Sequence, residues 1–411
     1  MTFSAVTTWL GSLISPKIRK LIEGHNEILT TVRNGISPGD RVVWFHVASL
    51  GEFEQGRPLM ELVRKNHPEY KILLTFFSPS GYEVRKNYEG ADVICYIPFD
   101  TKWGVNRFLK VVHPEIAIFI KYEFWYFFLS GMHKRGTRIY SVSSIFRDGQ
   151  IFFKFKNAAK VLRQFDHLFV QNQKSIDLLA SVDIHNATVV GDTRLDRVME
   201  IHRAAKDLPL VEMFKNGQKV FIAGSSWGPD EAIYIPYFKG HKDWKLIIAP
   251  HEIEGNRVDN LIAALEGRTA VRYTDMEKMM AEGASAMAEK MLREADVLIV
   301  DCFGKLSSIY RYGEIALVGG GFGAGIHNVP EAAVYGIPVL FGPNNKKFNE
   351  AQELKECQGA FEYTDTTSFA SVMDRLLSDS QALQEAGRRA GGYIQSHTGA
   401  TLKCYKAIFG E

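Results

Sequence analysis

Residues 42–56 read VVWFHVASLGEFEQG, and they decide the fold class of this chain. The first seven residues are an almost unbroken apolar run, which predicts a strand buried on both faces. Ser49, Leu50 and Gly51 form a tight turn, and residues 54–66 have the pattern of a helix. A buried strand that passes through a short turn into a helix begins a β–α–β unit with parallel strands.

The same alternation of strands and helices continues along the chain. Between its two halves, a largely polar segment contains Pro209, Asn216 and Gly217. We therefore predict an α/β protein with two Rossmann-like, doubly wound parallel-sheet domains facing across a cleft, namely residues 1–200 and 219–411, joined by a linker at 201–218. Further strands are predicted at residues 71–77, 93–96, 116–120, 138–142, 167–170 and 187–190, and then at 220–223, 245–248, 297–301, 315–318 and 339–341.

Size and composition agree with two globular domains and narrow the class of partner. The chain has 411 residues, more than one hydrophobic core ordinarily holds. It carries 49 basic and 47 acidic residues, and the net charge of +2 argues against nucleic acid as a partner. The four cysteines are scattered without a CxxC pair, so neither a zinc site nor a disulfide framework is predicted, and a reducing cytosolic compartment is expected.

The N-terminal segment allows two interpretations. Residues 3–14 include a short apolar stretch, and basic residues follow at positions 17, 19 and 20. The stretch is shorter than the roughly 20 apolar residues that cross a bilayer, and it lacks the features of a signal peptide. It predicts either a helix that lies on an anionic membrane surface or a helix that packs on the first domain.

Glu52 is the first candidate for chemistry. It stands where a predicted helix begins, and free backbone N–H groups and the positive end of the helix dipole gather there. Gly51 lets a substrate approach the backbone closely. A carboxylate in this position can take a proton from a sugar hydroxyl group. The alternative is that Glu52 only caps the helix, which is common for an acidic residue in a first turn.

The second candidate is the segment 318–343, VGGGFGAGIHNVPEAAVYGIPVLFGP. A strand ends there in a run of glycines at 319–325, and the backbone N–H groups of such a loop can bind phosphate. Glu331, in the helix that follows, can accept hydrogen bonds from ribose hydroxyl groups. The spacing differs from the dinucleotide fingerprint, so a dehydrogenase is not expected. A purely structural turn is the alternative.

Further segments support ligand binding in both halves. The loops 224–227 (GSSW), 249–252 (APHE) and 301–306 (DCFGKL) follow predicted strands, where a doubly wound domain binds ligands. Aromatic and basic residues alternate at 118–128 and 146–156, which fits either core packing or contact with an amphiphilic acceptor. The sequence has no recognisable metal-binding motif, and His327 is interpreted as a hydrogen-bonding group.

Together these motifs resemble those of bacterial 3-deoxy-D-manno-oct-2-ulosonic acid (Kdo) transferases, which attach Kdo to the lipid A precursor. The resemblance extends from about Trp44 to Pro343. It rests on HVASLGE at 46–52, FFSPSGYE at 76–83, YIPFDT at 96–101, KYEFW at 121–125, GDTRLD at 191–196, AGSS at 223–226 and HNVPEAA at 327–333.

The resemblance implies a GT-B fold, CMP-Kdo as donor, a lipid A precursor as acceptor, an inverting reaction, and no metal or other cofactor. It implies that Glu52 is the catalytic base and that the protein works at the cytoplasmic face of the inner membrane. The expected donor-binding residues are Ser225, Ser226, Pro250, His251, Phe303, Gly304, Lys305, Gly320, Asn328 and Glu331. The expected acceptor-binding residues are Arg57, Ser80, Lys121, Glu123, Arg147 and Arg194.

The chain departs from the family pattern at several positions. The family often has E-T-E-L-W where residues 121–125 read KYEFW, so only Glu123 can act as an acid there. Pro250 is followed directly by His251 without the usual arginine, and Ile326 replaces a glycine. Two alternatives remain open: another GT-B nucleotide-sugar enzyme, such as a UDP-sugar transferase or epimerase, or a catalytically degenerate scaffold.

Overall fold

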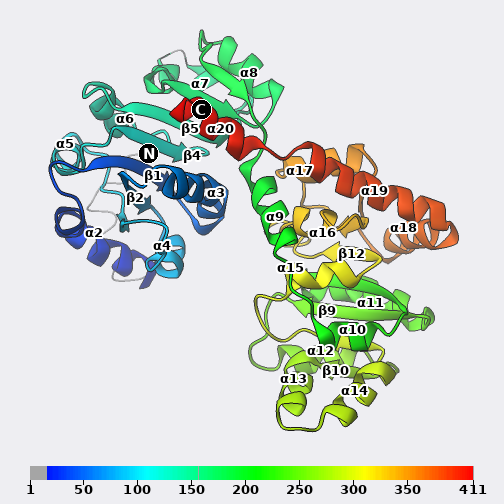
Figure 1. The fold of residues 1–411 in the computed structure, drawn as a ribbon. Helices are drawn as coiled ribbons and strands as arrows, with labels where there is room; N and C mark the ends of the chain where they lie inside the picture. The colour runs from blue at the N-terminus through cyan, green and yellow to red at the C-terminus, as the bar shows by residue number, and fades with distance from the viewer. Residues whose placement is uncertain (1–15, 156, 411) are drawn as a thin grey trace. The chain divides into compact units, whose positions relative to one another are not determined.

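A computed structural model describes residues 16–155 and 157–410 and divides them into two compact units (Figure 1). The first unit holds the described residues up to Arg197 and those from His397 onward, and the second unit is Val198–Ser396. Each unit contains one seven-stranded parallel β-sheet flanked by helices. The α/β class and the two doubly wound sheets predicted from the sequence are therefore confirmed.

The first sheet has the strand order β3-β2-β1-β4-β5-β6-β7. Strands are added outward from β1 and β4 in opposite directions, which is the doubly wound arrangement. The strands are β1 (Arg41–Val47), β2 (Tyr70–Phe76), β3 (Val93–Tyr96), β4 (Ile116–Ile120), β5 (Arg138–Ser144), β6 (His167–Val170) and β7 (Ala187–Val189).

Helices cover both faces of this sheet because its central strands are apolar on both faces. In β1, Val42 and Trp44 join one hydrophobic cluster, whereas Val43 and Phe45 join another. The helical segments are α2 (Pro16–Gly35), α3 (Leu50–Asn66), α4 (Pro79–Arg85), α5 (Lys102–Val112), α6 (Tyr126–His133), α7 (Ile151–Lys154), η1 (Ala158–Gln164), α8 (Gln173–Ala180), α9 (Thr193–Arg203) and α20 (Ala400–Phe409).

The second sheet has the strand order β10-β11-β9-β8-β12-β13-β14. Sequence analysis missed β10 and β14, because each of these three-residue strands ends in a charged residue, whereas β11 and β13 are apolar and buried throughout. The strands are β8 (Lys219–Ser226), β9 (Trp244–Pro250), β10 (Ala270–Arg272), β11 (Val297–Ile299), β12 (Ile315–Val318), β13 (Val339–Phe341) and β14 (Ala360–Glu362). The helical segments are α10 (Pro209–Lys215), α11 (Gly228–Gly240), α12 (Arg257–Ala264), α13 (Tyr273–Ala281), α14 (Ser285–Glu294), α15 (Leu306–Ile309), η2 (Tyr310–Tyr312), α16 (Pro330–Ala333), α17 (Asn349–Glu356), α18 (Thr366–Ser378) and α19 (Ser380–Ser396).

The segment 201–218, expected to link the domains, is largely folded. α9 continues to Arg203, and α10 buries Leu210, Val211 and Phe214. The Nζ of Lys245 in β9 donates a hydrogen bond to the carbonyl of Phe214 at 2.7 Å. Three apolar residues on one face of a short helix are enough to attach this polar segment to the second unit.

The last helix, α20, lies in the first unit, although residues 219–411 were expected to form one domain (Figure 1). Ala400, Cys404 and Ile408 recur every four residues and join the hydrophobic cluster that contains Val43. Asp196 accepts hydrogen bonds from the N–H groups of residues 399 and 401 at 2.5 and 2.6 Å. Burial of its apolar face on the first sheet decides the position of this helix, whatever its place in the sequence.

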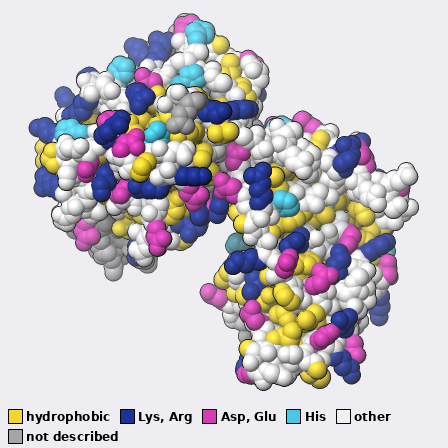
Figure 2. All heavy atoms as spheres, in the orientation of Figure 1, with side chains coloured by type: hydrophobic (Ala, Val, Ile, Leu, Met, Phe, Trp, Pro, Cys, Tyr) yellow, Lys and Arg dark blue, Asp and Glu magenta, His cyan; other side chains and the backbone are white. Residues whose placement is uncertain are grey.

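The surface mixes both signs of charge. Figure 2 shows acidic and basic side chains interspersed on the visible face of each unit, in keeping with the net charge of +2. Across the described residues, no helix combines the length and the apolar character that crossing a bilayer requires. Residues 3–14, interpreted above as a membrane-surface or packed helix, lie outside the described part of the chain.

Candidate active site

Each sheet has one point at which the connections leave in opposite directions, and doubly wound domains bind ligands outside the carboxyl ends of the strands there. In the first sheet this switch point lies between β1 and β4. The chain runs from β1 toward Glu52 and from β4 into Lys121 and Glu123. In the second sheet the switch point lies between β8 and β12, next to Ser225 and the glycine run at 319–325.

Glu52 lies in the first turn of α3, which begins at Leu50 rather than at residue 54. Ser49 is extended, with φ −140° and ψ 172°, and leads the chain from β1 into the helix. The Oε2 atom of Glu52 accepts a hydrogen bond from the backbone N–H of Ala48 at 2.5 Å. The capping contact considered as an alternative is therefore present, and it also orients the carboxylate over the turn.

The surroundings of Glu52 raise the pKa of its carboxyl group above the ordinary value. Burial is the largest cause, and the negative charge of Glu123 adds to it. The N–H of Ala48, Lys121 and His46 act in the opposite direction without cancelling the increase. A carboxylate with a raised pKa is a stronger base than an exposed one, which suits it to accept a proton from a hydroxyl group.

The backbone is unusual at the ends of β4 and β5. Lys121 and Ser143 both have positive φ angles, 62° and 57°. The N–H of Lys121 donates to the carbonyl of Val142 at 2.9 Å, and its own carbonyl accepts a hydrogen bond from Ser144 Oγ at 2.7 Å. Non-glycine residues in this conformation are uncommon and concentrate at functional sites. They mark the carboxyl edge of the first sheet as a candidate site.

Lys121, Arg147 and Arg194, three of the predicted acceptor-binding residues, lie near one another at this edge. Arg194 Nη2 donates to Asp192 Oδ2 at 2.7 Å, and Arg147 Nη1 donates to the hydroxyl of Tyr122 at 3.0 Å. Burial of Asp192 opposes ionisation, but Arg194 and Lys121 outweigh it and lower the pKa of this carboxyl group. Arg147 and Arg194 both act electrostatically on Tyr122, so the three cations share one neighbourhood.

Arg57 and Ser80 have local partners instead. Arg57 Nε donates to Glu61 Oε1 at 2.7 Å, and its guanidinium lies over the ring of Tyr88 at 5.7 Å. Ser80 Oγ lies 2.8 Å from Ser78 Oγ at the start of α4. None of the interactions described for these two side chains involves Glu52 or Lys121, so their predicted contact with an acceptor stays a prediction.

At the second switch point, backbone segments approach one another closely. A Cβ atom added to Gly319 would lie 2.3 Å from the carbonyl oxygen of Ser225, and one added to Gly224 would lie 1.9 Å from the hydroxyl of Tyr310. A Cβ added to Gly321 would lie 2.5 Å from the backbone of residue 342. The glycine run therefore has a packing reason in addition to any contact with phosphate.

The N–H groups of this run are partly engaged within the protein. The N–H of Gly319 donates to the carbonyl of Gly224 at 2.9 Å, and that of Gly323 donates to the carbonyl of Gly320 at 3.0 Å. The N–H of Gly320 donates to Asp230 Oδ2 at 3.1 Å. The predicted role of Gly320 in donor binding therefore cannot rest on its N–H group, and its φ of 94° shapes the loop.

Asp230 fastens this loop to α11 and β14. Its side chain is fully buried and also accepts hydrogen bonds from the N–H of Trp227 at 3.0 Å and from the hydroxyl of Tyr363 at 3.1 Å. Burial raises the pKa of Asp230, and the hydrogen bonds from Gly320, Trp227 and Tyr363 oppose this increase. The buried carboxyl group of Asp230 therefore holds the loop in place by hydrogen bonds and is not exposed to solvent.

A pocket of about 440 Å³ opens beside the glycine run. One side is a stack of three rings, in which the centroids of Trp227 and His251 are 4.5 Å apart and those of His251 and His327 are 4.4 Å apart. Trp227 Nε1 donates to His327 Nε2 at 3.2 Å, in agreement with the hydrogen-bonding role predicted for His327. Burial and then His251 lower the pKa of His327, which favours the neutral ring as acceptor. The volume is typical of small-molecule sites.

His251 and Gly320 are the predicted donor residues that line this pocket. Pro250 ends β9 in a buried position and places His251 beyond the strand. Ser225 has a φ of 51° near the end of β8. Ser226 is buried, and its Oγ donates to Glu231 Oε1 at 2.7 Å, so its side chain faces the interior of the unit.

Asn328 and Glu331 form a pair next to the pocket. Asn328 Nδ2 donates to Glu331 Oε1 at 2.7 Å. Burial raises the pKa of Tyr310, and Glu331 adds to this increase, so the carboxylate lies near the tyrosine that touches Gly224. The pair is therefore associated with the switch point of the second sheet.

The loop after β11 is more open. Phe303 is 77% exposed, and Gly304 has a φ of 81°. Lys305 Nζ donates to Glu277 Oε1 at 3.2 Å and lies over the ring of Tyr273 at 4.9 Å. An exposed aromatic ring beside a positive-φ glycine is available to a ligand, whereas the lysine is held by α13.

Several residues at the two switch points were not singled out as site residues from the sequence. In the first unit they are His46, Thr75 and Trp125, and in the second Trp227 and Asp230. His46 and Trp125 lie within the quoted motifs HVASLGE and KYEFW, and Trp227 lies within GSSW. A polar residue inside an otherwise apolar strand was the available signal for His46.

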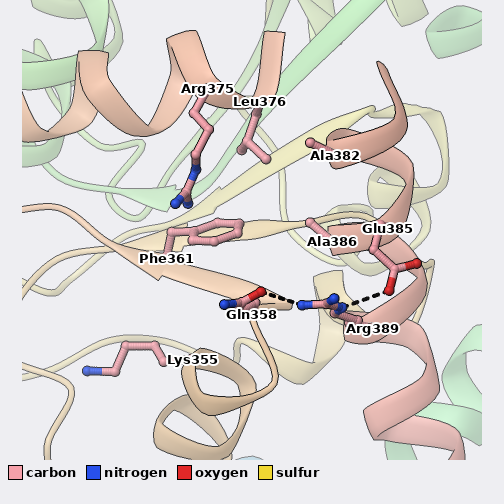
Figure 3. A pocket seen from close by; sticks show the side chains of 9 residues that line it. All are labelled: Lys355, Gln358, Phe361, Arg375, Leu376, Ala382, Glu385, Ala386 and Arg389. Carbon is pink, nitrogen blue, oxygen red and sulfur yellow. Dashed lines mark hydrogen bonds and ion pairs between the residues drawn. The ribbon is translucent and has the colours of Figure 1, made fainter. Parts of the chain in front are cut away.

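Two further observations concern sites elsewhere. Among residues 16–155 and 157–410, no group of three or more His, Cys, Asp or Glu side chains is arranged to hold a metal ion. A pocket of about 410 Å³ lies between α18, α19 and β14 (Figure 3). There Arg375 lies over the ring of Phe361 at 4.7 Å, and Arg389 contacts Glu385 and Gln358. None of the predicted site residues lines this pocket.

Comparisons with known proteins agree in pointing to one family of sequences. A family model described as 3-deoxy-D-manno-octulosonic-acid transferase (kdotransferase) matches residues 23–197. The 3-deoxy-D-manno-octulosonic acid transferase of Aquifex aeolicus is 28% identical over 346 residues, which cover 82% of this chain and 86% of the relative. The corresponding transferase of Haemophilus influenzae is 22% identical over 381 residues, covering 89% and 86%.

The fold is shared more widely than the sequence. The crystal structure of a putative UDP-N-acetylglucosamine 2-epimerase from Listeria monocytogenes superposes with a TM-score of 0.58 at 13% identity, covering 90% of this chain and 96% of that chain. A structure of HepE from Anabaena in complex with UDP superposes with a TM-score of 0.55 at 10% identity, covering 90% and 98%. These likenesses establish the GT-B-like fold and no more.

Proposed function

Because the chain belongs to the Kdo transferase family of GT-B glycosyltransferases, we propose that it transfers Kdo from CMP-Kdo to the lipid A precursor, with Glu52 as the general base. The observation that carries the proposal is the Glu52 carboxylate itself. It lies at the carboxyl edge of the first sheet, it is oriented by the N–H of Ala48, and its pKa is raised by burial and by Glu123.

The proposed reaction is a direct displacement. Glu52 accepts the proton of an acceptor sugar hydroxyl group, and the hydroxyl oxygen forms a bond to the anomeric carbon of Kdo. The bond between that carbon and a phosphate oxygen of CMP breaks, and its electron pair leaves with CMP. Attack from the face opposite CMP inverts the anomeric centre. The cations Lys121, Arg147 and Arg194 are suited to the phosphates of the acceptor.

We assign the donor to the pocket beside the glycine run. The stacked rings of Trp227 and His251 offer apolar faces to a base or sugar, and Glu331 can accept hydrogen bonds from ribose hydroxyl groups. His251 and the loop around Gly304 would balance the charge that develops on CMP, so we propose a metal-independent reaction.

A peripheral position at the cytoplasmic face of the inner membrane accords with an amphiphilic acceptor. Trp103, Tyr126, Ile151 and Phe155 are each more than half exposed, at 70%, 56%, 56% and 62%. They lie near the starts or ends of helices that follow β3, β4 and β5, on the carboxyl side of the sheet. Large apolar side chains in water at this edge are suited to contact acyl chains or lipid.

The test is transfer of Kdo from CMP-Kdo, generated in the reaction, to a tetra-acylated lipid A precursor in the presence of EDTA, read by mass spectrometry. A gain of one or more Kdo masses is expected. No product from folded protein, beside an active control transferase, would refute the proposal.

A nucleotide-binding experiment separates this proposal from that of a UDP-sugar enzyme. We expect CMP to bind more tightly than UMP or UDP in calorimetry. Preference for the uridine nucleotides would favour the alternative enzyme class, and binding of neither, without transfer, would favour a non-catalytic scaffold.

A further inference from the structure

Glu123 was expected to contact the acceptor, but its carboxylate is held within the protein. Its Oε2 atom accepts a hydrogen bond from Trp125 Nε1 at 2.7 Å and lies 3.1 Å from His46 Nε2. The side chain of Glu123 is 12% exposed, and that of His46 is fully buried. Two ring systems thus occupy the same carboxylate oxygen and fix its position.

The other ring nitrogen of His46 has partners deeper in the first unit. Trp44 Nε1 donates to Thr75 Oγ1 at 2.8 Å, and Thr75 Oγ1 lies 2.8 Å from His46 Nδ1. The carbonyl oxygen of Thr75 lies 3.1 Å from the same Nδ1 atom, so both ring nitrogens of His46 face oxygen atoms. The buried chain Trp44–Thr75–His46–Glu123 therefore runs from the core of the first unit to the edge of its sheet.

Glu123, at the end of this chain, acts electrostatically on the carboxyl group of Glu52. The charged or polar groups that influence the Glu52 carboxyl group are Glu123, the N–H of Ala48, Lys121 and His46. Glu123 is the one negative charge among them, and it opposes ionisation of Glu52. A negative charge near a partly buried carboxyl group disfavours its ionised form, so Glu123 makes Glu52 a stronger proton acceptor.

We propose that Glu123, held by His46 and Trp125, is a positioning residue that keeps Glu52 ready to accept a proton, and not a contact to the acceptor. This inference rests on the proposed function, because it assigns the second carboxylate of the same site. It also gives Lys121 a distinct part, since its positive charge moderates the same interaction from the end of β4.

The test is the pH dependence of kcat/KM for the variant Glu123→Gln, which keeps the shape of the side chain and removes its charge. We expect the acidic limb of the profile to move to lower pH, because Glu52 loses the neighbour that raises its pKa. The value of kcat at the plateau should fall, because Glu52 becomes a weaker base. The KM for the acceptor should stay the same.

Glu115→Gln is the matched control. Glu115 precedes β4, at the opposite end of the strand from Glu123, and its carboxylate binds Arg41 and Tyr70. Its removal should leave the pH profile where it is. If Glu123→Gln raises the acceptor KM and leaves the acidic limb unmoved, Glu123 is an acceptor contact and the inference is wrong.

A measurement without substrate separates this inference from the proposed function. The titration of the Glu52 side-chain carboxyl carbon can be followed by NMR in protein with labelled glutamate, with Glu52→Gln to assign its signal. A lower midpoint in Glu123→Gln than in the wild type supports the inference, even if the wild type fails to transfer Kdo. An unchanged midpoint in a folded variant overturns it.

Discussion

The two switch points share one topology but differ in chemistry. At the β1–β4 edge, the residues that gather are ionisable: Glu52, Glu123 and Lys121, with two arginines nearby. At the β8–β12 edge, the chain brings together glycines in close backbone contact and the stacked rings of Trp227 and His251. The same arrangement of strands thus gathers ionisable side chains in one unit and glycines and aromatic rings beside a pocket in the other.

The loops at the two switch points differ in how each uses a carboxylate. The turn before α3 leaves the carboxylate of Glu52 in the first helical turn, where it can titrate. The glycine run is fastened by the buried carboxylate of Asp230, which is occupied by three hydrogen-bond donors. A carboxylate used as a structural acceptor in one unit corresponds to a carboxylate proposed as a base in the other. Substitutions in one unit at a time test this contrast.

The largest effect is expected from Glu52→Gln. The amide oxygen of glutamine can still accept the hydrogen bond from Ala48, but it cannot take up a proton. We expect kcat to fall by about 100- to 10,000-fold, the range for loss of a general base. The affinity for CMP, measured by calorimetry, should not change, because the donor is assigned to the second unit. Activity close to that of the wild type would rule out Glu52 as the base.

The next effect concerns packing in the second unit. In Gly319→Ala the added Cβ would lie 2.3 Å from the carbonyl of Ser225, whereas at Gly228 nothing lies within 4 Å. We expect Gly319→Ala to lower the free energy of unfolding of the second unit by about 1–3 kcal/mol and to weaken CMP binding. Gly228→Ala, the control at the start of α11, should behave like the wild type. Urea denaturation and calorimetry measure both, and equal behaviour of the two variants would contradict the packing argument.

A smaller effect is expected from Trp227→Phe. Phenylalanine keeps an aromatic face toward His251 but cannot donate to His327. Loss of one hydrogen bond is worth about 0.5–1.5 kcal/mol, which corresponds to about a two- to tenfold increase in the Kd for CMP-Kdo or CMP. The value of kcat at saturating donor should hold. A fall in kcat with unchanged donor affinity would place Trp227 in the reaction step instead.

The smallest expected effect is that of Glu52→Gln on thermal stability. This substitution should raise stability at neutral pH, although it lowers activity. The pKa of Glu52 is raised in the folded protein, so the folded state binds a proton more tightly than the unfolded state does. Stability from this group is therefore fully present below the ordinary pKa of a glutamate, and it is lost as the pH rises from there through the raised pKa of the folded state. Glu52→Gln should unfold at a higher Tm than the wild type at neutral pH, and this difference should vanish in acid. A lower Tm for the variant at neutral pH would contradict the raised pKa.

Local patterns were sufficient for the elements that position the site. The apolar run at 42–48 predicted β1 within one residue, and the turn after it predicted that Glu52 stands at the mouth of a helix. The glycine run was found at the end of β12, and the loops GSSW and APHE at the ends of β8 and β9. These predictions were possible because a buried parallel strand and the turn that ends it are both encoded by residues adjacent in the sequence.

Other features depend on partners far away in the sequence. Glu123 was expected to bind the acceptor on the strength of its motif. The sequence could not reveal its hydrogen bond with His46, because the two residues are 77 positions apart. The glycines at 319 and 321 were read as a phosphate loop, because nothing local indicates that Ser225 and residue 342 lie against them. Nothing in the sequence around Cys404 indicates that its helix packs on the first sheet.

Local sequence patterns predicted the alternation of strands and helices, and with it two parallel sheets whose motifs lie at the carboxyl ends of strands. Ordered motifs along the chain also indicated the family. The order of the strands, and hence which loops meet at each switch point, depends on how distant segments pack. The same packing joins Trp44, Thr75, His46 and Glu123 into one chain. The physical reason is that hydrophobic periodicity is a local property, whereas hydrogen bonds between side chains and the burial of a carboxylate arise when separate segments pack together.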